Sequence, residues 1–269
     1  MPTTAPTIDW NLLLAGLGVC SAVMLAVWFV QSARRDATPV DIAWAANLGL
    51  LAVLYAVLAE GAVERRVLVG ALGGLWALRL AGWLAWHRLG SGRPEDARYA
   101  DLRRGWGAAA NRNFFWFFQA QGVLDVLLSL PFLLIASNVR ADLLPIEILG
   151  AVVAGLAICG ETAADVQLDR FKKEPASRGR TCRVGLWRYS RHPNYFFEWL
   201  FWIGIAIVAW SAPLGWVGIV APVVMLYLLW KVTGIPAAEA QAVKSRGQDY
   251  LDYQRTTSAF VPWFPREGR

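Results

Sequence analysis

Charge, cysteine and histidine are all scarce in this sequence, and each shortage narrows what the protein can be. Charged residues make up 17% of the 269 residues, against about 25% in soluble proteins, which disfavours an ordinary soluble globule. The three cysteines, at positions 20, 159 and 182, and the two histidines show no metal-ligand spacing, so we expect neither disulfides nor a metal site. No GxGxxG or Walker sequence occurs, which excludes a soluble nucleotide-binding domain.

Apolar residues, by contrast, are abundant and fall into long blocks. They make up 57% of the chain and form runs of about 17–25 residues, the length that crosses a bilayer as a helix. Many of the 15 tryptophans lie near the edges of these runs, as in the aromatic belts of membrane proteins. We predict an all-α polytopic membrane protein, one domain over residues 1–269. Its seven spans are 8–30, 40–59, 67–89, 114–136, 146–160, 195–210 and 214–232.

Lys and Arg are distributed unevenly between alternate loops. Counting those at span ends, 22 of the 26 fall in the C-terminal tail and in the loops after the first, third and fifth spans, and three fall in the opposite loops. Basic residues accumulate on the cytoplasmic side of membrane proteins. We therefore expect the N-terminus outside, the C-terminus inside and any active site facing the cytoplasm. The membrane also explains the net charge of +6 without nucleic-acid binding.

A charge inside a predicted span is costly and usually serves a function. The candidates of this kind are Asp41, Arg79, Asp125 and Glu198. Asp41 and Arg79 lie near the cytoplasmic ends of their spans, where snorkelling to water is the alternative. An ion pair with Arg79 would give Asp125 or Asp41 a purely structural role.

The densest group of polar and aromatic residues is the segment from Gly185 to Glu198, which runs into the sixth span. Pro193 favours a helix start, and Asn194 and Glu198, four residues apart, share one face of that helix. An amide and a carboxylate there can bind amide or hydroxyl groups of a ligand. The alternative is interfacial anchoring with an ion pair between Arg191 and Glu198.

An acidic stripe and a basic loop precede this segment. Glu161, Asp165 and Asp169 recur every four residues on the extension of the fifth span. The basic residues that follow are Arg170, Lys172, Lys173, Arg178, Arg180 and Arg183. Arginine suits phosphate, so the loop is a candidate for a phosphorylated ligand. A solvated helix face would explain the stripe without a ligand. The aromatic tail after residue 232 is expected to fold back under the bundle.

Together these residues resemble the steroid 5α-reductase superfamily, in its bacterial branch, the DUF1295 proteins. The resemblance covers most of the chain and rests on Arg191-His-Pro-Asn-Tyr-Phe-Phe-Glu198, Val40-Asp-Ile-Ala-Trp44, Arg79, Gly92-Arg-Pro-Glu-Asp-Ala-Arg-Tyr99, Asp165 with Leu168, Lys231-Val-Thr-Gly-Ile-Pro236 and the terminal Pro-Trp-Phe-Pro. It implies a seven-helix reductase of a bacterial inner membrane that holds NADPH in a cytoplasm-facing cavity. Such enzymes reduce a carbon–carbon double bond conjugated to a carbonyl in a lipid or steroid-like substrate, which enters from the bilayer.

The resemblance assigns the nucleotide half of the site residue by residue. The family's Asn and Glu on the sixth span match Asn194 and Glu198, and its Asp after the fifth span matches Asp165. Its cofactor-binding Arg is matched at best by Lys172. The implied NADPH-binding set is Glu161, Asp165, Leu168, Lys172, Arg180, Arg183, Trp187, Tyr189, Arg191, His192, Asn194, Tyr195 and Glu198.

The substrate half departs from the steroid-reducing members. Their Glu on the second span and Tyr on the third, which polarise the steroid carbonyl, are matched by Asp41 and Trp76. An indole N–H donates a hydrogen bond but is not a useful acid, which weakens the case for a 3-oxo-steroid among lipid enones. The implied catalytic set is Asp41, Trp76 and Arg79.

Two other functions remain open. The isoprenylcysteine carboxyl methyltransferases and phospholipid methyltransferases share an RHPxY segment before a helical hairpin and use S-adenosylmethionine. They generally have Gly soon after RHPxY and a paired Glu in the tail, where this chain has Phe196-Phe197 and Ala238-Glu239. A lipid transporter or scaffold would be expected to show repeat symmetry, which the sequence lacks, and no nucleotide affinity.

Overall fold

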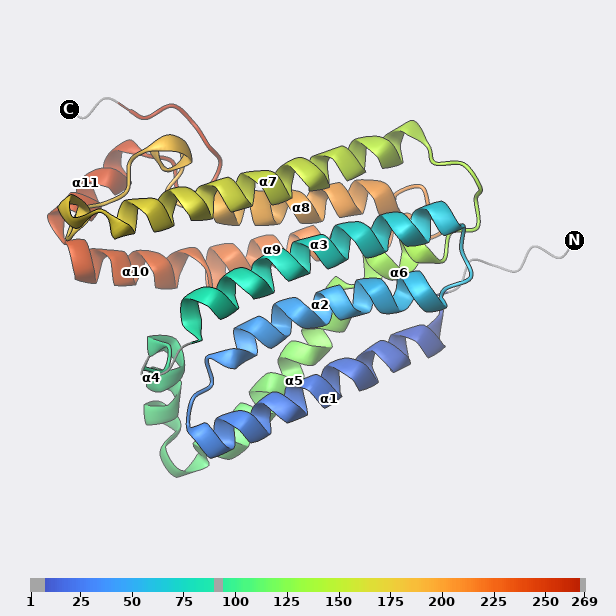
Figure 1. Cartoon of the computed structure of the whole chain (residues 1–269), viewed down its shortest axis with the longest axis horizontal. Coiled ribbons are helices and arrows are strands. Elements are labelled where there is room, and N and C mark those ends of the chain that lie inside the picture. Colours follow the sequence, from blue (N-terminus) through green and yellow to red (C-terminus); the bar gives the residue numbers. More distant parts are fainter. Residues whose placement is uncertain (1–7, 90–93, 267–269) are drawn as a thin grey trace, which may run out of the picture. The chain divides into compact units, whose positions relative to one another are not determined.

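The computed structural model describes residues 8–89 and 94–266, and every regular element within them is helical (Figure 1). The predicted all-α class is therefore confirmed. The chain forms two compact units, Met1–Glu147 with Val208–Ala221 and Ile148–Ile207 with Pro222–Arg269. Three helices pass from one unit to the other along the chain: α7 (Pro145–Lys173), α8 (Pro193–Ala209) and α9 (Val220–Tyr227).

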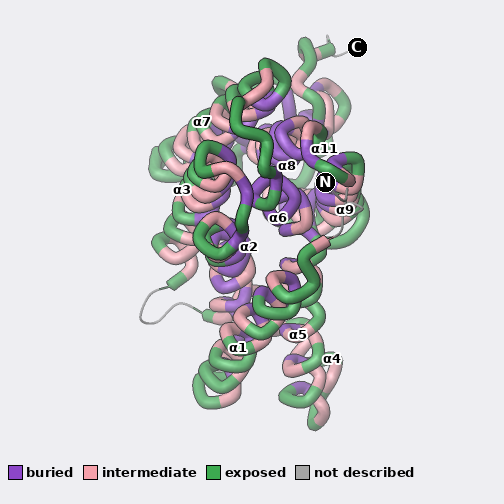
Figure 2. The backbone as a smooth tube through the Cα atoms, turned by 90° about the vertical axis from the view of Figure 1, so that its right-hand side faces the viewer, coloured by how far each residue is buried: buried purple, intermediate pink, exposed green. Residues whose placement is uncertain are grey.

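The helices of the first unit are α1 (Trp10–Arg34), α2 (Pro39–Leu58), α3 (Val63–Arg88), α4 (Ala97–Trp106), α5 (Ala110–Leu128) and α6 (Leu130–Ala136). Their exposure differs widely (Figure 2). α1 buries a stripe that includes Leu13, Cys20 and Met24 at helical spacing, and it exposes apolar residues such as Leu14 and Phe29 on its other faces. An apolar surface of this length fits contact with lipid tails. α6, by contrast, is buried from Pro131 to Ala136.

Small residues bring α2 and α3 close together. A Cβ atom at Gly73 would lie 2.4 Å from the Cβ of Ala52, so only glycine allows this approach of the two helices. Along the same pair of helices the rings of Trp44 and Trp76 meet edge to face, with centroids 6.4 Å apart. The close packing fixes Trp76 on α3 relative to the segment of α2 that carries Asp41.

The predicted fourth span, 114–136, is not one continuous helix. α5 ends at Leu128, and α6 begins at Leu130. Pro131 has no N–H to donate to the carbonyl four residues earlier, so the α-helical ladder is interrupted near Ser129. At the other end of α5, a 3₁₀ turn, η1 (Gly107–Ala109), joins it to α4.

In the second unit, α7 continues from the predicted end of the fifth span at Gly160 to Lys173. No Gly or Pro interrupts the chain between 161 and 174. Two 3₁₀ turns, η2 (Pro175–Ser177) and η3 (Gly185–Arg188), lead on to α8. A Cβ atom at Gly204 would lie 2.6 Å from the backbone nitrogen of Ala154, so α8 packs closely on α7.

The predicted seventh span, 214–232, is also divided. It consists of a 3₁₀ segment, η4 (Gly215–Ile219), then α9, then a π-helical turn, η5 (Leu228–Val232). Pro222 cannot donate a hydrogen bond to the carbonyl of Gly218, which explains why the α-helix does not extend back through η4.

The C-terminal tail forms α10 (Ile235–Arg246), α11 (Gln248–Thr256) and an extended segment. The Arg191 N–H donates to the carbonyl of Ser258 at 2.8 Å, and the Ser190 hydroxyl donates to the carbonyl of Phe260 at 2.7 Å. The tail therefore folds back, as expected, onto the segment that precedes α8.

Six helical stretches within the described residues are long and apolar enough to cross a membrane. They are Trp10–Arg34, Pro39–Leu58, Val63–Arg88, Ala97–Ala136, Pro145–Lys173 and Gly215–Arg246. α8 is apolar too but has only 17 residues. The chain is an integral membrane protein, while the seventh crossing and the orientation stay predictions.

Candidate functional site

One face of α7 carries four of the predicted cofactor residues. Glu161, Asp165, Leu168 and Lys172 are spaced by four, three and four residues and therefore share a helix face. Glu161 and Asp165 are only 2% and 8% exposed, so the alternative of a solvated acidic stripe is wrong for these two carboxylates. The alternative of a solvated acidic face does apply to Asp169, one turn later, which forms an ion pair of 2.7 Å with the exposed Lys173.

Asn194, in the first turn of α8, contacts this face directly. Its Nδ2 donates to Oδ1 of Asp165 at 3.2 Å. Its own Oδ1 is buried and has no hydrogen-bond partner among the described residues. Leaving a buried acceptor unsatisfied costs about 1–3 kcal/mol, so this oxygen is suited to an amide or hydroxyl donor of a ligand. Glu198, one turn further along the same face of α8, is 9% exposed.

The segment between α7 and α8 is held against α7 by hydrogen bonds. The Trp187 indole donates to the carbonyl of Ala164 at 2.8 Å, and the Trp187 carbonyl accepts a short hydrogen bond from the Tyr253 hydroxyl. Gly185, with φ of +57°, makes the turn that lets the Leu186 N–H donate to Gln167 Oε1 at 2.8 Å. Trp187 is thus buried as a structural anchor of the segment.

Arg191 and His192 both face Glu239 of α10. Arg191 Nε donates to Glu239 Oε1 at 2.7 Å, and His192 Nε2 lies 3.3 Å from the same oxygen. The alternative of an ion pair between Arg191 and Glu198 is therefore wrong, because Arg191 binds Glu239 in the tail instead. Sequence analysis compared Glu239 with the tail of the methyltransferases but did not predict this contact, since nothing local links a tail residue to a segment 48 residues earlier.

Two aromatic residues of the predicted set, Tyr189 and Tyr195, flank Arg191 and His192 in the sequence. The Tyr195 ring stacks on His192, with centroids 5.4 Å apart and an angle of 6° between the planes. Tyr189 is exposed and meets the ring of Phe264 in the tail. Tyr195 thus helps to orient the imidazole, and Tyr189 contacts the end of the tail.

The basic loop is tied to α11 through Asp249. The Thr181 N–H donates to Asp249 Oδ2 at 2.6 Å, and the Arg183 guanidinium to Oδ1 at 3.0 Å. Burial raises the pKa of Asp249, but the hydrogen bonds from Thr181 and the charges of Arg183 and Arg180 lower it, and the lowering prevails. Arg180 is exposed. Arg183 is therefore held by the protein itself, and sequence analysis missed its partner.

The predicted catalytic residues lie in the first unit. Asp41, in the first turn of α2, accepts hydrogen bonds from Arg88, from the Tyr99 hydroxyl and, at 2.7 Å, from Arg98. The alternative in which Asp41 forms an ion pair with Arg79 is therefore wrong. Arg79 is partly buried on α3, three residues after the fully buried Trp76.

Asp125 also forms a contact other than the alternative ion pair with Arg79, because its partner is Asn47. Asp125 lies on α5 and is fully buried, and its Oδ2 accepts a hydrogen bond of 2.9 Å from Asn47 Nδ2 on α2. This contact joins α2 to α5 inside the first unit.

The motif from Gly92 to Tyr99 explains how Asp41 is surrounded, although Gly92 and Arg93 lie outside the described residues. The Ala37 N–H donates to Glu95 Oε1 at 2.8 Å, and the Asp96 N–H donates to Thr38 Oγ1 at 2.9 Å. The motif therefore packs on the start of α2 and brings Tyr99 to Asp41.

Comparison with known families identifies the chain at the level of a family. The model of the DUF1295 family, described as a protein of unknown function, matches residues 27–257. This match spans most of the sequence, so the chain belongs to the DUF1295 family. No curated protein and no solved structure matches it.

Proposed function

We propose that this DUF1295 protein is a membrane-embedded NADPH-dependent reductase of a carbon–carbon double bond in a lipid or steroid-like enone. The observation that carries the proposal is the pair formed by Asp165 and Asn194, in which the buried Asn194 oxygen has no partner among the described residues. A nicotinamide carboxamide offers an N–H donor to such an oxygen. Asp165, Asn194 and Glu198 are also the positions that the resemblance to the steroid 5α-reductase superfamily assigns to the cofactor.

The remaining cofactor residues divide into contacts and supports. We assign Lys172 and Arg180 to the cofactor phosphates. Arg180 is exposed, and Lys172 is repelled by a second cation, Arg246, so an anion between them would be attracted by both charges. Trp187 and Arg191 are positioning residues, because one anchors the loop to α7 and the other anchors it to the tail. When bound, NADPH supplies the hydride for the β-carbon of the enone.

In the substrate half, Asp41 serves as an acceptor. Its carboxylate oxygens accept hydrogen bonds from two guanidinium groups and one hydroxyl. Asp41 therefore orients Arg88, Arg98 and the Tyr99 hydroxyl. Trp76 and Arg79 keep their proposed place as donors towards the substrate carbonyl. Stabilisation of developing enolate charge by such fixed donors is the main catalytic contribution expected of the protein.

The proposal includes the membrane topology. α8 provides a seventh crossing in addition to the six long stretches, the N-terminus lies outside, and the cofactor residues face the cytoplasm of a bacterial inner membrane. The asymmetry of Lys and Arg between loops supports this orientation.

Titration of the purified protein with NADPH tests the proposal. Asn194→Ala should weaken NADPH binding about 5- to 150-fold, because removing the amide leaves a buried donor of the ligand unpaired at about 1–3 kcal/mol. Gln241→Ala is the matched control, since it removes an exposed amide from α10 of the same unit. Equal affinities of the two variants would remove Asn194 from the site.

S-adenosylmethionine-dependent methyl transfer is the second candidate, and the contact of Glu239 with Arg191 and His192 favours it. A tail Glu beside an RHPxY segment is a feature of the methyltransferases that this chain resembles more distantly. The same titration separates the candidates. Binding of S-adenosylmethionine by a protein that ignores NADPH would establish the methyltransferase and overturn the reductase.

A further inference from the structure

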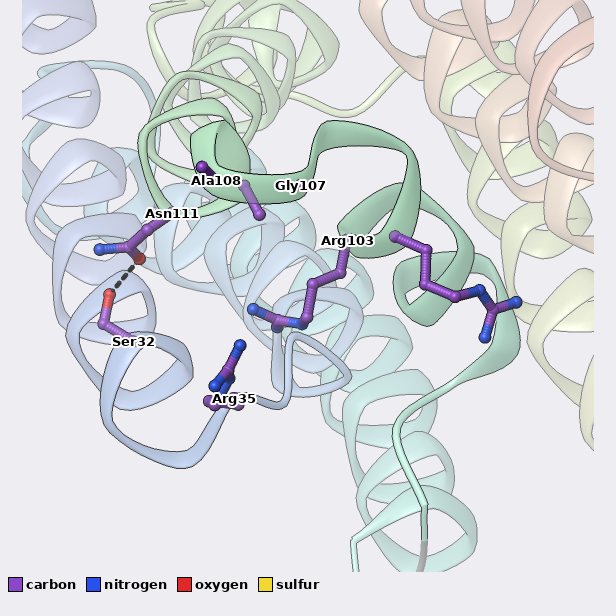
Figure 3. A pocket seen from close by; sticks show the side chains of 8 residues that line it. Ser32, Arg35, Arg103, Gly107, Ala108 and Asn111 are labelled. Carbon is purple, nitrogen blue, oxygen red and sulfur yellow. Dashed lines mark hydrogen bonds between the residues drawn. The ribbon is translucent and has the colours of Figure 1, made fainter.

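A basic cavity lies in the first unit, between the end of α1 and the junction of α4 with α5 (Figure 3). Its volume is about 610 Å³. Its polar lining comes from Ser32, Arg35, Arg103, Arg104 and Asn111. None of these residues belongs to the cofactor or substrate sets, so the cavity is a separate feature of the protein.

Three guanidinium groups surround this cavity, and they are unequally neutralised. Arg103 is held by Glu95 at 2.8 Å. Arg104 pairs with Asp101 in an exposed ion pair. Arg35, which follows the last residue of α1 and has a φ of 54°, has no side-chain hydrogen bond or ion pair with any residue in 8–89 or 94–266. Figure 3 shows Arg35 and Arg103 extending into the same space. The cavity therefore carries net positive charge and favours an anion.

The hydrogen bonds around the cavity keep its wall in place. Asn111 Oδ1 accepts from the Ser32 hydroxyl at 2.6 Å and from Gln31 Nε2 at 2.7 Å. The Trp28 indole donates to the Asn111 carbonyl at 2.9 Å. These contacts join the last turns of α1 to the first turn of α5, so the wall is preformed.

The cavity lies where α1 ends and α5 begins. α1 ends at Arg34, immediately before Arg35, and α5 begins at Ala110. Within two turns of the cavity, apolar side chains are exposed on both helices: Phe29 is 58% and Trp116 is 65% exposed. A ligand with an anionic head and apolar tails matches this combination. Arg103 and Arg104 lie between the third and fourth predicted spans, in one of the loops rich in Lys and Arg. Anionic lipids attract Lys and Arg at the cytoplasmic surface.

We propose that this cavity binds the phosphate headgroup of an anionic phospholipid whose acyl chains lie along the exposed apolar faces of α1 and α5. The guanidinium groups of Arg35 and Arg104 contact the phosphate, and Arg103 contributes charge while Glu95 fixes its position. The bound lipid is a structural ligand and stays chemically unchanged.

Binding of lipid to delipidated, detergent-solubilised protein tests this proposal. The probes are a short-chain phosphatidylglycerol, a short-chain phosphatidylcholine and inorganic phosphate. Each basic residue near an anionic lipid contributes about a fivefold change in binding, so Arg35→Gln with Arg104→Gln should weaken phosphatidylglycerol binding about 30-fold. The matched control is Arg34→Gln with Arg112→Gln, which removes the same charge from exposed residues next to the cavity. The control keeps the arginines that line the cavity, so it should lose much less phosphatidylglycerol binding than the variant of Arg35 and Arg104.

Several results would overturn the proposal. Equal losses in the two double variants would show general charge attraction, and no loss in either would show that the cavity is not the site. Inorganic phosphate that competes as strongly as the lipid would identify a site for a free anion. Phosphatidylcholine that binds as tightly as phosphatidylglycerol would remove the role of net charge. Arg35→Lys should retain most of the binding, which separates loss of charge from misfolding.

Discussion

Replacing Asp41 by Asn removes the charge at the centre of a small ionic network. Asp41 accepts hydrogen bonds from Arg88, Arg98 and the Tyr99 hydroxyl, which come from α3 and α4. An Asn side chain has one acceptor oxygen and two N–H donors, and these donors face groups that are themselves donors. The change therefore leaves two guanidinium groups short of an acceptor.

The magnitude follows from how far the network is exposed. The side chains of Asp41, Arg88 and Arg98 are 18%, 31% and 37% exposed, so the network lies between a buried pair and a surface pair. Hydrogen bonds to charged groups contribute about 1.5–3 kcal/mol each when buried, and surface pairs contribute about 0.2–1 kcal/mol. We expect Asp41→Asn to lower the free energy of unfolding by about 2 kcal/mol.

Equilibrium unfolding in mixed micelles measures this loss. The thiol of Cys20 is fully buried in α1 of the same unit, so its reaction with a thiol reagent reports unfolding there. Asp101→Asn is the control, because it breaks a pair whose side chains are 66% and 75% exposed and should cost less than about 1 kcal/mol. If the two variants lose the same stability, the network around Asp41 does not hold the first unit together.

Other consequences concern a buried pair, acid stability and topology. Glu147→Gln should destabilise the first unit by about 3–5 kcal/mol in the same unfolding assay, because Arg65 and Glu147 are both fully buried and joined by two hydrogen bonds of 2.7 Å. The folded pKa of Asp249 is lowered, so its contribution to stability is present above the ordinary Asp value of about 3.9 and is lost as the pH falls through the folded pKa; Asp249→Asn should flatten this acid limb of the stability profile. Reporter fusions at Met1 and Arg269 should lie on opposite sides of the membrane, and fusions on one side would contradict an odd number of crossings.

Hydropathy and spacing predicted the helical elements well because both depend on local sequence. The blocks of apolar residues located α1, α2 and α3, and the four-residue spacing placed Asp165 on the same face as Glu161. The interruptions at Ser129 and in η4 were missed, although Pro131 and Pro222 are visible signals for them.

The partners of charged residues could not be read in the same way, because they depend on contacts between distant segments. Asp41 and Tyr99 are 58 residues apart, and Thr181 and Asp249 are 68 apart. In both cases a loop folds back onto a helix end, and nothing in the local pattern selects that partner over other ions of the same charge. The Asp165–Asn194 contact was accessible only through the family resemblance, which brought both residues into one predicted set.

Transfer of a deuterium label from the cofactor tests the central claim most directly. The protein, reconstituted in lipid, is incubated with bacterial lipid extract, NADPH deuterated at the nicotinamide C4 and S-adenosylmethionine carrying a ¹³C-labelled methyl group, and the lipids are analysed by mass spectrometry. The reductase account predicts an unsaturated lipid that gains a deuterium from the cofactor and a hydrogen from water, with much less product from Asn194→Ala than from Gln241→Ala. A lipid that instead gains a labelled methyl group from S-adenosylmethionine, while no deuterium is transferred, would contradict it.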